Sequence, residues 1–134
     1  MTVEKIDHVG IAVKSIEEAL PYYRDVLGLE FDGVEVVSEQ KVRVAFLRVG
    51  ESRIELLEPM SPDSPISAFL DKRGPGIHHI SVRVDDICKT LLSHQNAGRQ
   101  LIDSSPRTGA HNTKIAFVHP KATSGVLLEL SEKS

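Results

Sequence analysis

The chain has 134 residues, a length that suits one ordinary globular domain and excludes a multidomain assembly. Its composition, 40% hydrophobic and 26% charged, is typical of a folded protein and excludes a disordered, collagenous or coiled-coil chain. Lysine and arginine total 16 against 19 for aspartate and glutamate, so the net charge is -3. Without a general positive field, the protein is not expected to bind nucleic acid.

No part of the sequence is expected to enter a membrane or a secretory pathway. No run approaches the ~20 apolar residues that a bilayer-spanning helix needs. Residues 1–5 lack the basic and then apolar pattern of a signal peptide. Cys88 is the single cysteine, so no disulfide can form within the chain. We therefore expect a cytoplasmic protein.

The first half of the chain predicts a strand, a helix and three further strands. Residues 6–13 alternate in the manner of a half-buried strand, and a helical pattern follows over residues 15–27. Ser15 with Glu18 forms a capping-box pair at the start of this helix, and Gly28 suits a left-handed residue at its end. The three further strands are predicted over residues 31–37, 42–49 and 53–58.

A connector rich in proline separates this half from a second one with the same order of elements. Residues 59–65 contain three prolines, and residues 66–72 fit a short helix before Gly74-Pro75-Gly76. A strand over residues 77–84 and a helix over about 86–97 come next. The last three strands are predicted near Leu101, over 114–119 and over 125–130.

The two halves repeat each other in sequence. His8 and His79 lie in matching strands at an offset of 71 residues (79 − 8), and this offset persists through the third strand of each half. Glu55 and Glu129 then match at an offset of 74 (129 − 55), as three extra residues in the 121–124 loop would produce. Such self-similarity constrains the whole fold.

The repeat predicts an α+β protein made of two tandem βαβββ modules. We predict one domain over residues 1–134, with module one over about 3–60, a connector over about 61–75 and module two over about 76–132. The apolar face of each first strand is expected to cover the helix of its module.

The opposite face of each first strand carries a histidine among small residues. Alternation places His8 with Gly10 and Ala12, and places His79 with Ser81. Small side chains beside a polar one leave room on a buried sheet, which is what a ligand cavity needs.

Glu55 and Glu129 are isolated carboxylates within apolar strands, and burying a carboxylate is costly unless a cation accompanies it. With His8 and His79 they provide four nitrogen and oxygen donors, which suit one Co²⁺, Mn²⁺, Ni²⁺, Fe²⁺ or Zn²⁺ ion. An octahedral ion held this way keeps two positions open for substrate. The alternative is that the histidines are hydrogen-bonded core residues and the glutamates surface charges, but repetition at matched positions favours the metal.

The chain resembles the vicinal oxygen chelate (glyoxalase/bleomycin resistance/dioxygenase) superfamily and, within it, the methylmalonyl-CoA epimerase family. The segments that carry the resemblance are residues 6–13, 54–59, 76–80 and 125–130, and it runs over essentially the whole chain. It implies a curved mixed sheet around a metal-binding cavity and assembly as a homodimer. The metal ligands that it implies are His8, Glu55, His79 and Glu129.

The resemblance also implies an isomerase that acts on an acyl-CoA. The reaction is interconversion of the (R) and (S) forms of methylmalonyl-CoA, by proton abstraction at C2 through a metal-stabilised enolate. The implied cofactor is one divalent ion per chain, with Co²⁺ the first candidate and Mn²⁺, Ni²⁺ or Zn²⁺ as others. The catalytic glutamate of the family precedes the third strand in a Glu-Gln-x-Val context, which assigns this role to Glu39.

The second acid or base, on the opposite face of the substrate, stays open between two residues. An offset of 71 from Glu39 reaches Ala110 (110 − 39), with His111 alongside, and Glu129 is the other candidate. Arg83 shares the strand face of His79, so it either contacts a substrate carboxylate or takes part in an ion pair.

Three other activities are compatible with such a scaffold to different degrees. A glyoxalase-like lyase acting on a glutathione adduct would need the same metal and a base. An extradiol-type dioxygenase normally uses two histidines and one carboxylate, which fits four donors less well. A non-catalytic small-molecule-binding protein would need no metal, so the repeated donor set argues against it.

Overall fold

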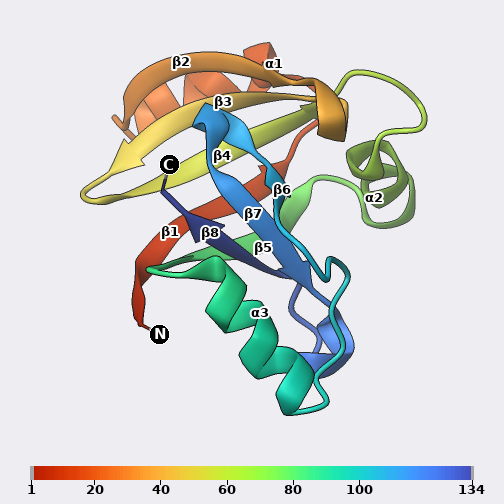
Figure 1. Ribbon diagram of the computed structural model, residues 1–134. Helices are drawn as coiled ribbons and strands as arrows, with labels where there is room; N and C mark the ends of the chain where they lie inside the picture. The colour runs from red at the N-terminus through yellow and green to blue at the C-terminus, as the bar shows by residue number, and fades with distance from the viewer. Residues whose placement is uncertain (1, 134) are drawn as a thin grey trace. The chain divides into compact units, whose positions relative to one another are not determined.

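The computed structural model describes residues 2–133 (Figure 1). The chain divides into two compact units. One spans His8–His78 and is called the N-terminal unit; the other joins the residues up to Asp7 with those from His79 onward and is called the C-terminal unit. Within residues 2–133, no helix is both long enough and apolar enough to cross a membrane.

The N-terminal unit contains a four-stranded arrangement in the order β2-β3-β4-β1. Strand β1 runs parallel to β4, whereas β2, β3 and β4 pair antiparallel. The elements are β1 (Val3–Ala12), α1 (Ile16–Leu20), a π-helix (Pro21–Val26), β2 (Glu30–Val37), a 3₁₀ turn (Ser38–Gln40), β3 (Val42–Val49), β4 (Ser52–Pro59) and α2 (Pro65–Arg73).

The C-terminal unit has the same plan, in the order β1-β5-β8-β7-β6 starting from the first residues of β1. Its elements are β5 (Gly76–Val84), α3 (Ile87–Asn96), β6 (Arg107–Thr108), a 3₁₀ turn (Ala110–Asn112), β7 (Lys114–Val118), a second 3₁₀ turn (Pro120–Ala122) and β8 (Leu128–Glu132). Strands β5 and β8 are parallel, as β1 and β4 are. The predicted pair of βαβββ modules is confirmed.

The strand register shows the same repeat residue by residue. In each unit a glutamate on the last strand lies between a small residue and a phenylalanine of the two flanking strands. These three-residue rows are Gly10, Glu55 and Phe46 in one unit and Ser81, Glu129 and Phe117 in the other. The offsets of 71 and 74 residues therefore describe equivalent positions in space within each unit.

One apolar core lies between the helix and the strands of each unit. Because side chains alternate along a strand, the core residues beside Glu55 and Glu129, such as Leu56 and Leu130, put the two carboxylates on the face away from the helix. The buried core residues are Val13, Ile16, Leu20, Ala45, Leu47 and Leu56 in one unit and Val84, Ile87, Leu91, Ala116, Val118 and Leu130 in the other.

The first helix begins as predicted and then changes its hydrogen-bonding pattern. The hydroxyl of Ser15 accepts from the Glu18 N–H at 3.3 Å, and Gly28 has the left-handed φ of +81°. Pro21 has no N–H to donate, and beyond it Leu27 N–H bonds to Tyr22 O at 2.7 Å, a spacing of five residues. The predicted helix over 15–27 is therefore a short α-helix continued by a π-helix.

Two strands of the second half lie elsewhere than predicted. Leu101 forms only a single bridge, to Val118, and the strand at this place in the order is Arg107–Thr108. The last strand begins at Leu128 instead of residue 125, because Gly125 closes a turn: its φ is +94° and its N–H bonds to Pro120 O at 2.8 Å. Both shifts come from loop geometry, which leaves little trace in hydrophobic periodicity.

Helices α1 and α3 are each tied at the N-terminus to the strand that carries the glutamate of their unit. Glu58 Oε1 accepts from Ile16 N–H at 2.9 Å, while its Oε2 bonds Arg43 at 2.8 Å. In the C-terminal unit, Glu132 accepts from Ile87 N–H at 2.8 Å. A carboxylate suits this place because the first N–H groups of a helix have no partner within the helix and carry partial positive charge.

We expect that replacing Glu58 with alanine lowers the free energy of unfolding by about 1–3 kcal/mol, because a part-buried N–H and Arg43 both lose their acceptor. Urea denaturation followed by circular dichroism measures this. Glu17→Ala, at an exposed position in the first turn of the same helix, is the control and should change stability little. Equal midpoints for the two variants would contradict the anchoring role.

Candidate active site

In the N-terminal unit, His8 of β1 and Glu55 of β4 form a buried pair. Their Nδ1 and Oε2 atoms are 3.2 Å apart, and the residues are 6% and 3% exposed. Arg53 lies two residues before Glu55 and donates to the same Oε2 from Nη2 at 2.9 Å. The guanidinium carbon of Arg53 also lies 5.7 Å from the centre of the Phe46 ring. Glu55 therefore has an arginine to balance part of its charge.

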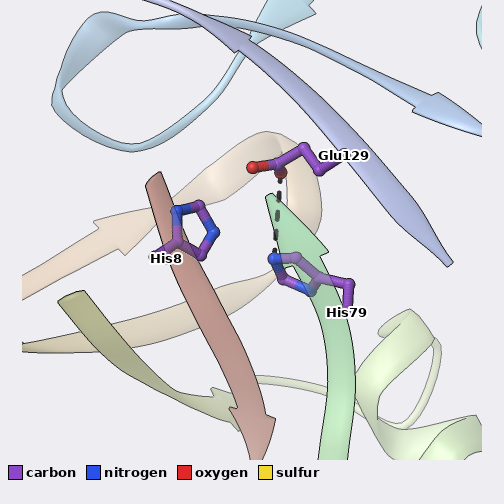
Figure 2. A group of neighbouring side chains, drawn as sticks. All are labelled: His8, His79 and Glu129. Carbon is purple, nitrogen blue, oxygen red and sulfur yellow. Dashed lines mark ion pairs between the residues drawn. The ribbon is translucent and has the colours of Figure 1, made fainter. Parts of the chain in front are cut away.

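In the C-terminal unit, His79 of β5 and Glu129 of β8 form the equivalent pair. Figure 2 shows the two side chains facing each other, with 4.0 Å between Nε2 and Oε2. The His79 ring meets Phe117 edge to face, with 5.6 Å between ring centres. The residue equivalent to Arg53 is Leu127 (127 − 53 = 74), so this pair lacks an arginine at that position.

The donor chemistry of these pairs fits a divalent metal ion. Each pair offers an imidazole nitrogen and a carboxylate oxygen, and none of the donors is a thiolate. Burying an ionised carboxylate is costly unless a cation or hydrogen bonds compensate its charge. The described residues that could take part in holding a metal ion are all buried: Asp7, His8, Glu55, His79 and Glu129.

Arg83 is paired with a buried aspartate that the sequence analysis did not single out. Its Nη2 and Nε lie 2.7 and 3.1 Å from Asp7 Oδ1, and Asp7 is 2% exposed. Of the two roles left open for Arg83, the structure shows the ion pair. The pair lies within the C-terminal unit, since Asp7 belongs to the first residues of β1.

Replacing Arg83 with alanine is expected to cost about 3 kcal/mol of folding free energy, because a buried carboxylate loses its arginine. Thermal and urea unfolding measure the loss. Arg99→Ala removes an exposed arginine of the same unit and is the matched control. Adding Asp7→Asn to Arg83→Ala should restore part of the stability. Equal losses of folding free energy in Arg83→Ala and Arg99→Ala would contradict this prediction.

Glu39 lies in the exposed 3₁₀ turn that joins β2 to β3. The turn closes through Lys41, which has a φ of +55° and donates its N–H to Ser38 O at 3.1 Å. Met60 N–H in turn donates to Lys41 O at 2.9 Å. The carboxylate of Glu39 is thus carried on a defined turn at the surface of the N-terminal unit.

The connector after β4 holds this turn through side chains as well. Asp63 pairs with the Lys41 ammonium and accepts from the Ser61 hydroxyl, and these two bonds lower the pKa of Asp63 to about 2. Ser64, which is buried, has its hydroxyl 3.5 Å from Gln40 O. The residues next to Glu39 are therefore fixed from the side of the connector.

His111 lies in the exposed 3₁₀ turn before β7 and has a φ of +56°. The residue that begins this turn, Gly109, is buried, and a Cβ there would lie 2.8 Å from Ile115 Cγ2. The close approach of this turn to β7 therefore requires glycine at position 109.

His78 packs against the connector helix, in keeping with a structural role. Its ring meets that of Phe69 in α2 edge to face, with 5.1 Å between centres. Burial, with a smaller effect of the nearby Arg73 charge, lowers the pKa of His78 to about 4. The ring is therefore neutral near pH 7 and packs as an aromatic group.

Several residues beside the two pairs were missed in the sequence analysis. Phe46 and Phe117 keep the offset of 71, and Arg53 shares a strand face with Glu55, so both signals were available. Asp7 had no such signal, because its partner lies 76 residues away on another strand (83 − 7).

Comparisons with known proteins agree with this geometry. The family described as Glyoxalase/Bleomycin resistance protein/Dioxygenase superfamily matches residues 7–117. An uncharacterized protein of Bacillus subtilis is 47% identical over 130 residues, 97% of this chain and 93% of its own. An ethylmalonyl-CoA/methylmalonyl-CoA epimerase of Cereibacter sphaeroides is 37% identical over 97% of this chain and 98% of its own. A solved structure of a methylmalonyl-CoA epimerase in complex with methylmalonyl-CoA and NH4+ superposes on this chain with a TM-score of 0.94. The two sequences are 34% identical, and the match covers 99% of this chain and 96% of the other.

Proposed function

Because this chain belongs to the Glyoxalase/Bleomycin resistance protein/Dioxygenase superfamily, and within it to the methylmalonyl-CoA epimerase family, we propose that it is an isomerase that interconverts the (R) and (S) forms of methylmalonyl-CoA. The observation that carries the proposal is the buried histidine–glutamate pair found once in each unit, His8 with Glu55 and His79 with Glu129. A relative matched over 98% of its length is an epimerase of such thioesters.

In this proposal the two pairs hold one divalent ion per chain. His8 and His79 would bind it through ring nitrogens, and Glu55 and Glu129 through carboxylate oxygens. Co²⁺ is the first candidate, and Mn²⁺, Ni²⁺ and Zn²⁺ accept the same donors. When bound, the ion supplies Lewis acidity to the oxygens that flank the reacting carbon.

Side chains of the protein provide the bases for proton transfer and the apolar surface around the carboxylates. C2 of the substrate lies between a thioester and a carboxylate, so its proton is weakly acidic and needs a base within reach. Glu39, on its exposed turn, takes that role for one face of the carbon. His111 and Glu129 are the two candidates for the other face. Phe46 and Phe117, beside the glutamates in register, provide apolar surface that limits water around the carboxylates.

The proposal extends to substrate contacts, assembly and location. Arg83, held by Asp7, is a candidate contact for the substrate carboxylate. We expect a homodimer from the family resemblance, and light scattering of the purified protein measures the assembly. A cytoplasmic location is part of the same proposal.

A coupled assay tests the function. A stereospecific enzyme that consumes only one epimer stops when half of racemic methylmalonyl-CoA is used, and addition of this protein with Co²⁺ should carry consumption to completion. Ethylmalonyl-CoA tested in parallel reports on the acyl group. Turnover of the glutathione–methylglyoxal adduct instead would indicate a glyoxalase-like lyase, and binding without turnover a non-catalytic binding protein. Either result would overturn the proposal.

A further inference from the structure

Ser81 of β5 is a buried polar residue whose hydroxyl the protein does not satisfy. It is 0% exposed, and its Oγ makes no hydrogen bond to any atom of residues 2–133. It lies on the same strand face as His79, two residues away, and opposite Glu129 in the register of β5 and β8. The equivalent position in the N-terminal unit is Gly10 (81 − 10 = 71), which has no side chain.

A buried hydroxyl without a partner costs about 1–3 kcal/mol. Burial alone does not impose this cost, because Ser64, which is 1% exposed, accepts from Ile66 N–H at 3.2 Å. Glycine at the equivalent position shows that the repeat can be built without a hydroxyl there. The position of Ser81 therefore suits a group that arrives from outside the chain, next to His79 and Glu129.

The chemistry of that group follows from what a hydroxyl can do. Serine offers one donor, and its strongest acceptors are oxygens that carry negative charge. Within the two glutamate rows, Ser81 and Gly10 are the equivalent residues that differ in type, so the hydroxyl belongs to the row of the C-terminal unit. A malonyl-type thioester has two different oxygen groups, a charged carboxylate and a neutral thioester carbonyl. A hydrogen-bond donor beside His79 and Glu129 would favour binding of the carboxylate there over binding of the carbonyl.

We propose that Ser81 Oγ donates a hydrogen bond to the carboxylate of the bound thioester and so fixes which end of the malonyl group lies beside His79 and Glu129. This inference rests on the proposed function and adds a specificity-determining residue to it. A bound water is the other group that could accept a hydrogen bond from Ser81 Oγ. Comparing a thioester that has a carboxylate with one that lacks it separates the water from the carboxylate.

Calorimetry on the Co²⁺-loaded protein compares malonyl-CoA, which has the carboxylate, with propionyl-CoA, which lacks it. Ser81→Ala should weaken binding of malonyl-CoA by at least about 10-fold and leave that of propionyl-CoA within about 2-fold. Ser81→Thr, which keeps a hydroxyl, should retain most of the affinity of the wild type for malonyl-CoA. Without ligand, the Tm of Ser81→Ala should equal or exceed that of the wild type, because an unsatisfied buried hydroxyl is removed.

Thr90→Val is the matched control, since Thr90 is buried in α3 of the same unit and its Oγ1 donates to Asp86 O at 2.8 Å. This variant should lower the Tm and leave both affinities unchanged. Unchanged malonyl-CoA affinity in Ser81→Ala would overturn the inference. An equal loss for both thioesters, with weaker binding of Co²⁺ alone, would assign the oxygen to a water and overturn the carboxylate assignment. If the wild type binds Co²⁺ but not malonyl-CoA, the proposed function fails first and the assignment of Ser81 with it.

Discussion

Replacing Glu129 with alanine is expected to remove the metal from the protein and to lower kcat/KM for epimerisation by about 10³-fold. Glu129 is 4% exposed, and the position equivalent to Arg53 beside it is a leucine. In the N-terminal unit, by contrast, Glu55 Oε2 accepts a hydrogen bond from Arg53 at 2.9 Å. Because Glu129 is one of the four proposed ligands, its loss should weaken metal binding.

Metal content after dialysis and initial rates with methylmalonyl-CoA measure this effect together. Glu129→Gln keeps the shape and one neutral oxygen, so it should lose less metal than Glu129→Ala. Glu17→Ala, an exposed glutamate of α1, should retain full metal content and activity. One equivalent of tightly held Co²⁺ and an unchanged rate in Glu129→Ala would show that this carboxylate is not a ligand.

Replacing Glu39 with alanine is expected to lower kcat by about 10²- to 10⁴-fold, the usual contribution of a general base, without loss of metal. The residue is exposed in a turn and forms no part of either core, so the Tm should stay close to that of the wild type. Gln40→Ala changes the same turn without removing a carboxylate and is the matched control.

Measuring Glu39→Ala with each epimer separately tests which face of C2 Glu39 serves. If Glu39 serves one face of C2, solvent deuterium uptake should fall far more when the reaction starts from one epimer than from the other. Full uptake from both epimers in Glu39→Ala, together with loss of uptake in His111→Ala, would place the base in the turn that contains His111.

The repeat made most of the fold predictable, because it supplied two independent readings of one pattern. His8 and His79 fix the first strand of each module, and Glu55 and Glu129 the last. The strand register confirms that these positions are equivalent within their units. Residue type and alternation also sufficed to place all four side chains on buried strand faces.

What the sequence did not reveal depends on contacts between distant segments or on single backbone angles. Asp7 and Arg83 pair across two strands with no shared motif. Strand β6 contains two residues, too few for a periodic signal, and β8 begins late because of the turn at Gly125. The sequence around Ser81 does not show that its hydroxyl is buried without a hydrogen-bond partner, which only the structure reveals.

The most direct test of metal-dependent proton exchange is deuterium uptake at C2 of methylmalonyl-CoA in D₂O, measured against added Co²⁺. Chelated protein should show no uptake, and the rate should rise with metal and level off at one equivalent per chain. Uptake that persists after complete chelation would contradict the role of the metal. Absence of uptake in protein that carries one Co²⁺ per chain would contradict the assignment of methylmalonyl-CoA as substrate.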